Sequence, residues 1–200
     1  VATMENKGLE VDLGYRKQLG QVNLSFKTNA SYVKNEVTDM GATDYLVNAT
    51  FQSSAYEISR KMVGMPVNAF FGFVTDGVFQ NEGDIARHHN DDGLAIQPDA
   101  KPGDFRFVDI NGDGVISSLD RTYLGDPTPH WSFGLSIAAT WKAFDLSVFG
   151  QGVAGNKIFQ GLRRLDIPAA NYSEKALNRW HGEGTSDDFA RLVAGDPNGN

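Results

Sequence analysis

The sequence predicts an all-β fold that contains an antiparallel sheet with unusually long strands. Apolar and polar side chains alternate in two separate segments, over ten residues or more in the longest runs, whereas strands of globular proteins usually have about 5–6 residues. Glycine accounts for 22 of the 200 residues and aromatic side chains for 11%. Alternation with a period of two residues places one kind of side chain on each face of a strand, so both segments are expected to have an apolar and a polar face.

The first of these segments, 1–36, is predicted to form a hairpin. Leu9, Val11, Leu13 and Tyr15 alternate with polar residues, and the same alternation resumes from 22 to 32. Residues 17–21 interrupt the pattern with a short polar stretch, which is typical of a tight turn between two antiparallel strands.

The second segment, 130–152, is predicted to form another hairpin, with its turn at 142–143. Its first strand begins at Trp131 and ends at Trp141. Aromatic residues at that spacing suit a tilted transmembrane β-strand, which needs about 9–11 residues. A soluble β-sandwich also alternates apolar and polar residues, so the pattern alone leaves both interpretations open.

The segment between the hairpins, 37–129, has a different character. It mixes short apolar runs with Gly, Asp, Asn and Pro, and residues 75–130 contain eleven acidic and four basic side chains. The net charge of −7 therefore comes entirely from this stretch. We expect a long acidic loop region here. After the second hairpin, 153–200 is predicted to be part of a further loop, with a short helix over 173–180 that Ser173 caps.

Composition excludes several classes of function. A net charge of −7 and a pI near 5.0 argue against a nucleic-acid-binding protein, which would carry a basic surface. The sequence has no run of about 18 apolar residues that would form a transmembrane helix, and its first residues lack the pattern of a signal peptide. The chain has no cysteine, which excludes disulfides and thiolate metal sites.

No catalytic motif is present in the sequence. It lacks the nucleophile motif GxSxG, the zinc motif HExxH and the phosphate-binding motif GxxxxGK[ST]. Its carboxylates are abundant, but their spacing assigns no acid and base pair. We therefore predict no catalytic residues and expect that the chain is not an enzyme.

One segment, 109–120, matches the twelve-residue calcium-binding loop closely. Gly114 occupies the sixth position, where the template requires a sharp turn, and Asp120 replaces the usual Glu at position 12, so its reach is shorter. Residues before the segment predict a strand rather than the helix of an EF-hand. Six residues are predicted to supply oxygen ligands to calcium: Asp109, Asn111, Asp113, Val115 (through its carbonyl), Ser117 and Asp120. An Asp- and Asn-rich turn that binds no ion is the alternative.

Several motifs together resemble SusC/RagA-type TonB-dependent outer-membrane proteins. Asp104 to Ile116 is similar to the family signature GD-x-x-x-x-D-x-N-G-D-G-x-I. Five further segments resemble the family in the same order: 6–10, 72–80, 120–127, 144–152 and 177–180. The resemblance covers essentially the whole chain.

This resemblance implies that the chain is a late portion of a large transmembrane β-barrel. Residues 1–36 and 130–152 would be barrel hairpins, while 37–129 would be an extracellular loop region and 153–200 part of the next one. The family imports glycans or peptides across the outer membrane of Gram-negative Bacteroidetes, together with a SusD-like lipoprotein. Its contact with TonB involves parts of the protein that this chain lacks, and outer-membrane lipid would surround the strands.

Two alternatives remain open from the sequence. A calcium-stabilised, soluble β-domain that binds carbohydrate would show the same alternation and the same loop. A fragment of a β-rich glycoside hydrolase would use carboxylates that the sequence does not identify.

Overall fold

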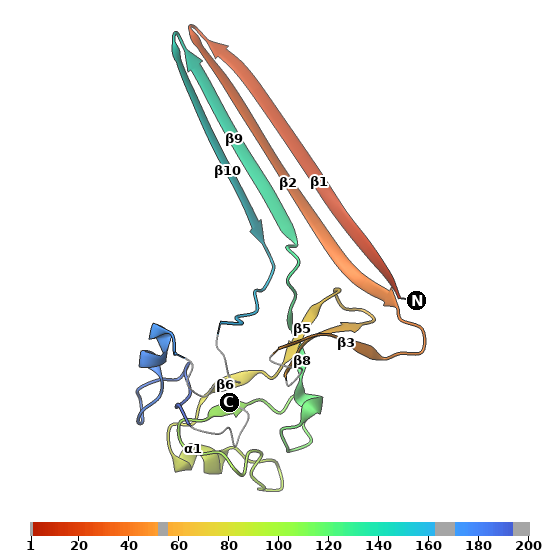
Figure 1. Ribbon diagram of the computed structural model, residues 1–200, viewed down its shortest axis with the longest axis vertical. Helices are drawn as coiled ribbons and strands as arrows, with labels where there is room; N and C mark the ends of the chain where they lie inside the picture. Colours follow the sequence, from red (N-terminus) through yellow and green to blue (C-terminus); the bar gives the residue numbers. More distant parts are fainter. Residues whose placement is uncertain (1, 52–55, 163–170, 194–200) are drawn as a thin grey trace. The chain divides into compact units, whose positions relative to one another are not determined.

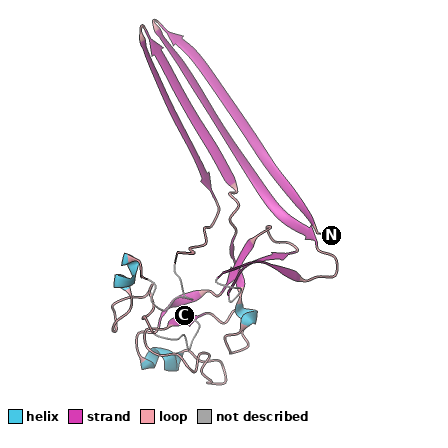
Figure 2. Ribbon diagram, in the orientation of Figure 1, coloured by secondary structure: helices cyan, strands magenta, loops and turns pink. Residues whose placement is uncertain are grey.

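The computed structural model describes residues 2–51, 56–162 and 171–193. The chain divides into two compact units. The first contains Val1–Thr50, Glu57–Phe70 and Gly125–Phe159, and the second contains Phe51–Tyr56, Phe71–Leu124 and Gln160–Asn200. Strands dominate the described residues, and helical turns are few and short (Figure 2). The predicted all-β, antiparallel fold is confirmed.

Four long strands form the main sheet of the first unit. They are β1 (Thr3–Leu19), β2 (Val22–Asp39), β9 (Trp131–Trp141) and β10 (Phe144–Ala154), in the order β1-β2-β9-β10. All neighbours are antiparallel, and both tight turns lie at the same end of the sheet (Figure 1). The two segments with alternating residues therefore form two adjacent hairpins of one sheet, although they are far apart in the sequence.

The first hairpin turn is tighter than predicted, and the second is as predicted. β1 continues to Leu19 and pairs with Val22, so the turn consists of Gly20 and Gln21 rather than 17–21. Gly20 has a φ of +61°, a conformation that two-residue hairpin turns require and glycine adopts without strain. The predicted turn at 142–143 is confirmed, since Trp141 pairs with Phe144.

The register of the sheet aligns the faces of all four strands. Tyr15 lies opposite Phe26, Phe26 opposite Ile137, and Ile137 opposite Val148. One residue further along each strand, Arg16, Ser25, Ala138 and Ser147 form the neighbouring row, on the other face of the sheet. This register joins the apolar sides of the four strands into one face of the sheet. A shift of one residue at any pairing would mix the two faces.

Short strands fill the segment between the two hairpins. β3 (Tyr45–Phe51), β4 (Tyr56–Met62), β5 (Ala69–Gly72) and β8 (Thr122–Gly125) form a second sheet in that order. β6 (Thr75–Val78) pairs with β7 (Phe105–Phe107), and the helical turns are α1 (Glu82–Arg87) and the 3₁₀ turn η1 (Ser118–Asp120). In the second unit, Phe71, Val78, Phe79 and Phe107 are buried. The second unit therefore has a small core, to which β5, β6 and β7 contribute.

The expected helix at 173–180 is shorter than predicted. The structure has a 3₁₀ turn, η2 (Glu174–Asn178), and Ser173 precedes it without a capping hydrogen bond from its side chain. Of the predicted loop 153–200, residues 163–170 and 194–200 lie outside the described residues. Among the described residues, no helix has the length and apolar character needed to cross a membrane.

Candidate functional site

The main sheet exposes its apolar face. Leu9, Leu13 and Leu146 are 68%, 59% and 63% exposed, and every described residue of β1 is exposed. Monomeric proteins in water rarely leave a contiguous apolar surface of this extent uncovered. Thr28 also lies on this face, and its hydroxyl donates to the carbonyl of Gly134 at 3.0 Å. This polar side chain on the apolar face therefore has a hydrogen-bond partner within the sheet and does not depend on water.

Aromatic residues mark both ends of the apolar face. At the end away from the turns, the rings of Tyr32 and Trp131 lie 4.8 Å apart. At the turns, Trp141 stacks on Phe144 at 6.2 Å, with the Lys142 ammonium 4.9 Å from the Trp141 ring. The ten residue steps from Trp131 to Trp141 span about 33 Å along the strand. A tilt of about 40° reduces this to about 25 Å, the height of the apolar band of outer-membrane barrels.

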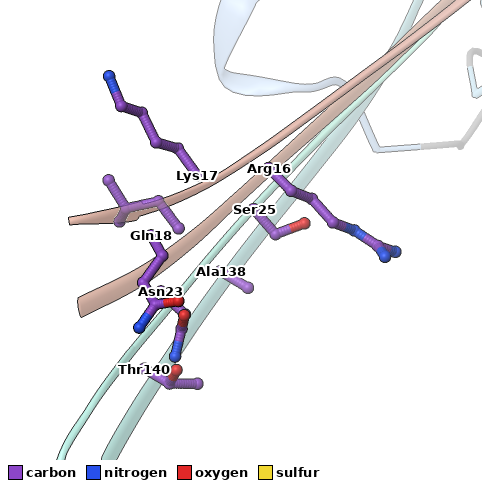
Figure 3. Close-up of a pocket in the computed structure, with 8 residues that line it drawn as sticks. Arg16, Lys17, Gln18, Asn23, Ser25, Ala138 and Thr140 are labelled. Atoms are coloured by element: carbon purple, nitrogen blue, oxygen red, sulfur yellow. The ribbon is translucent and has the colours of Figure 1, made fainter. Parts of the chain in front are cut away.

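The opposite face of the sheet is polar. Ser31 and Ser132 join their hydroxyls across β2 and β9 at 2.7 Å, and Arg16 and Lys27 supply positive charge near the turns. Figure 3 shows a shallow hollow at the turn end, where Arg16 lies on the polar face and Lys17, the next residue of β1, extends to the opposite, apolar side. Gln18, Asn23 and Thr140 form one row there. This face presents hydroxyl, amide and charged groups that water can solvate.

The predicted cation loop connects β7 to η1 in the second unit. Asp109, Asp113 and Asp120 each place a carboxylate oxygen within 4.8 Å of the others. Ligand oxygens lie 2.3–2.6 Å from calcium, so two ligands of one ion are separated by about 5 Å at most. The structure therefore brings three of the six predicted ligands close enough to hold one ion.

Backbone N–H groups hold these carboxylates in place. Asp109 accepts hydrogen bonds from the N–H groups of Gly112 and Gly114, both at 2.7 Å, and Asp113 accepts one from Val115 at 3.1 Å. Gly112 and Gly114 have φ values of +72° and +84°, which other residues adopt only with strain. The glycines thus allow the loop to fold back over its acidic side chains.

Asp120 is completely buried. It accepts hydrogen bonds from the N–H groups of Ser117 at 2.7 Å and Ile110 at 2.9 Å, so it connects the two ends of the loop. Burial alone would raise the pKa of Asp120, but the N–H groups of Ser117, Ile110 and Asn111 outweigh it and hold the pKa below its ordinary value. Asp120 is therefore a carboxylate that stays charged inside the protein.

The other three predicted ligands lie in the same loop. The side chain of Asn111 contacts Asp113, with its amide nitrogen 2.8 Å from a carboxylate oxygen. The hydroxyl of Ser117 accepts a hydrogen bond from the N–H of Leu119 at 3.1 Å as part of a capping box with Asp120. Val115 is exposed. In this conformation the Ser117 hydroxyl caps η1.

Two further buried carboxylates were not foreseen from the sequence. Asp104, fully buried in the second unit, pairs with Arg191 at 2.6 Å. Asp126, 1% exposed in the first unit, lies 3.2 Å from the His130 ring nitrogen. Asp104 and Arg191 are 87 positions apart in the sequence, and no local motif signals such a pair. Both carboxylates hold loop segments together.

The comparisons with known proteins agree with this geometry. No protein-family model matches the chain. Two TonB-dependent receptors of Formosa agariphila, P3 and P26, are 28% and 27% identical to it over 197 and 196 residues, or 96% of the chain. The predicted resemblance to TonB-dependent receptors is confirmed. The chain spans about one fifth of the length of these relatives, 19% in each case.

Solved structures support the same fold. The RagAB peptide transporter superposes on 98% of the chain with a TM-score of 0.65 and 17% identity. The matched region is 21% of the length of the transporter chain. The RagAB peptide importer in its closed-closed state gives a TM-score of 0.52 over 78% of the chain, at 20% identity. The chain therefore shares the fold of one portion of the RagAB transporter. These relatives are receptors and transporters, in agreement with the expectation that the chain is not an enzyme.

Proposed function

We propose that the chain is part of the transmembrane barrel of an outer-membrane TonB-dependent transporter. The observation that carries this proposal is the apolar face between the rows of Tyr32 and Trp141, which a charged side chain, Lys17 opposite Leu24, interrupts only next to the turns. Hydrocarbon is the environment that such a face requires, and the polar face would then line the lumen. A soluble β-domain would need other protein to cover residues such as Leu13.

We further propose the topology, the partners and the cargo. Because barrel proteins of bacteria have short periplasmic turns and longer outer loops, the turns at 20–21 and 142–143 would face the periplasm and residues 37–129 the exterior. The complete protein would import a glycan or a peptide in a Gram-negative Bacteroidetes species, with TonB and a SusD-like lipoprotein as partners. The similarity to TonB-dependent receptors supports this proposal.

Spin labels on neighbouring residues of β9 test the membrane assignment. Leu135 lies on the apolar face and Ser136 on the polar face, and the chain has no cysteine of its own. Leu135→Cys and Ser136→Cys, each labelled in the complete protein in lipid bilayers, form a matched pair. We expect oxygen, which dissolves in lipid, to relax the label at 135 more, and a water-soluble nickel complex to relax the label at 136 more. Equal access of the nickel complex to both would refute the assignment.

We also propose that the loop 109–120 binds calcium as a structural ion. Three converging carboxylates and the backbone turns support it, because a hard cation needs oxygen ligands and charge compensation. The ion would order part of a long outer loop, whose ordering costs entropy. Calcium should raise the melting temperature of the complete protein in detergent, and a chelator should reverse this. The exposed Asp91 offers a control: Asp91→Asn should respond to calcium like the wild type, whereas Asp113→Ala should not. If calcium leaves the wild type unchanged, the loop binds no structural ion.

A further inference from the structure

Two lysines lie just beyond the aromatic row at the end of the apolar face away from the turns. Lys7 on β1 is directly opposite Lys34 on β2, next to the row in which Leu9 faces Tyr32 on the same side of the sheet. Both lysines are exposed, at 74% and 63% of their side-chain surface. Their backbone positions lie about 7 Å along the strands from the row of Tyr32, whose ring contacts Trp131.

The charges at this edge are sorted by row. The next row outward pairs Glu5 with Glu36, so like charges face one another across the strands in both rows. Each lysine bonds a glutamate of its own strand, Lys7 to Glu5 at 2.8 Å and Lys34 to Glu36 at 2.6 Å. Like charges directly opposite one another destabilise a sheet. Exposure of these side chains to water therefore does not explain why lysine faces lysine and glutamate faces glutamate. This order places two ammonium groups nearest to the aromatic row and two carboxylates further out.

We propose that Lys7 and Lys34 together bind the phosphate group of an anionic lipid at the membrane surface. This inference rests on the proposed function, since it requires lipid on the apolar face. Tyr and Trp rings sit at headgroup depth in membranes, so the next row outward reaches the phosphates. One phosphate between the two ammonium groups would remove their mutual repulsion, and each lysine contributes to the attraction towards an anionic surface.

The glutamates do not prevent this interaction. Ion pairs between exposed side chains contribute little to stability, so a lipid phosphate can replace Glu5 and Glu36 as the partner of the lysines. The polar face provides the contrast. Lys27 lies on the same strand as Lys34 and is also exposed, but it faces Gly14 and Ser136 in a row of the polar face. The proposed lipid site therefore depends on the position of Lys7 and Lys34 on the apolar side of the sheet as well as on their charge.

Native mass spectrometry of the complete, delipidated protein in detergent tests the proposal. The probes are phosphatidylglycerol, which is anionic, and phosphatidylcholine, which has a phosphate but no net charge. We expect the wild type to retain more phosphatidylglycerol, and the double variant K7Q/K34Q to bind it about fivefold more weakly or worse, since each lysine near a membrane contributes measurably. Lys27→Gln is the matched control and should bind like the wild type. K7R/K34R should restore retention.

Three outcomes would overturn the proposal: equal retention of both lipids by the wild type, full retention by K7Q/K34Q, or an equal loss in Lys27→Gln. Inorganic phosphate should not compete at millimolar concentration, and competition would identify a site for free phosphate instead. The spin-label experiment on Leu135 and Ser136 reports separately on the membrane assignment. If that assignment holds and K7Q/K34Q keeps its lipid, only the lipid site is wrong.

Discussion

Asp120 shows how a single residue organises the cation loop. It is the last predicted ligand, yet in the structure it also accepts N–H groups from both ends of the loop, at Ile110 and Ser117. Its complete burial is tolerated because these donors compensate the charge. The sequence template predicts Asp120 as a ligand, but it carries no information on this hydrogen-bonding role, which depends on how the loop closes.

At this residue, Asp120→Asn should loosen the loop. An amide has one acceptor oxygen in place of two, so either Ser117 or Ile110 loses its partner, at a cost of about 1–3 kcal/mol. Hydrogen exchange of the peptide containing 109–120 should accelerate in the complete protein without added calcium. The exposed control, Asp91→Asn, should leave that peptide unchanged, and equal exchange in wild type and Asp120→Asn would contradict the proposed bracing role.

The loop glycines offer a second test at the residue scale. Gly112 and Gly114 both have positive φ, but a Cβ on Gly112 meets nothing within 4 Å, whereas one on Gly114 would lie 2.5 Å from the side-chain nitrogen of Asn90. Gly112→Ala should cost only the backbone strain, about 1 kcal/mol. Gly114→Ala should cost more, because Asn90 must also move.

Calcium titration by calorimetry and hydrogen exchange of the loop would measure the difference between the two alanine variants. The Gly112→Ala variant serves as the control for backbone strain. Equal effects of the two substitutions would mean that Asn90 does not constrain the turn at Gly114.

At the scale of the element, each long strand of the main sheet has an apolar face and a polar face. Leu135 and Ser136 are neighbours in β9, and their cross-strand partners are Gly150 and Phe149 in β10. A sequence pattern assigns each residue to a face, but only the register decides whether the faces of four strands coincide. In this structure the faces of the four strands coincide. A substitution on one face of the sheet can therefore be compared with a substitution on the other face.

This gives a prediction for β9. Leu135→Arg places a charge near the middle of the apolar band and should destabilise the barrel by about 2–4 kcal/mol, whereas Ser136→Arg on the lumen face should cost little. Urea unfolding of the complete protein in lipid vesicles, followed by tryptophan fluorescence, compares the two variants. Equal destabilisation by both arginines would show that the faces are not in different environments.

At the scale of the whole molecule, the main sheet has two free edges among the described residues, along β1 and β10. Unpaired strand edges and an exposed apolar face both promote association. The isolated chain 1–200 should therefore fail to form a monomer in buffer without detergent. Light scattering after size-exclusion chromatography measures its mass, and a monodisperse monomer with a cooperative melting transition would contradict the assignment of Leu9 to Tyr15 to lipid.

Local sequence patterns predict the two long-stranded hairpins, the faces of their strands and the three carboxylates of the loop. Each of these depends on residues close in sequence: alternation with a period of two, and oxygen ligands spaced over twelve positions. The tertiary structure alone decided that the two distant hairpins join through β2 and β9, that Asp104 meets Arg191, and that Lys7 faces Lys34. These contacts depend on the pairing of distant segments, which the total burial and hydrogen bonding of the chain select and no local pattern encodes.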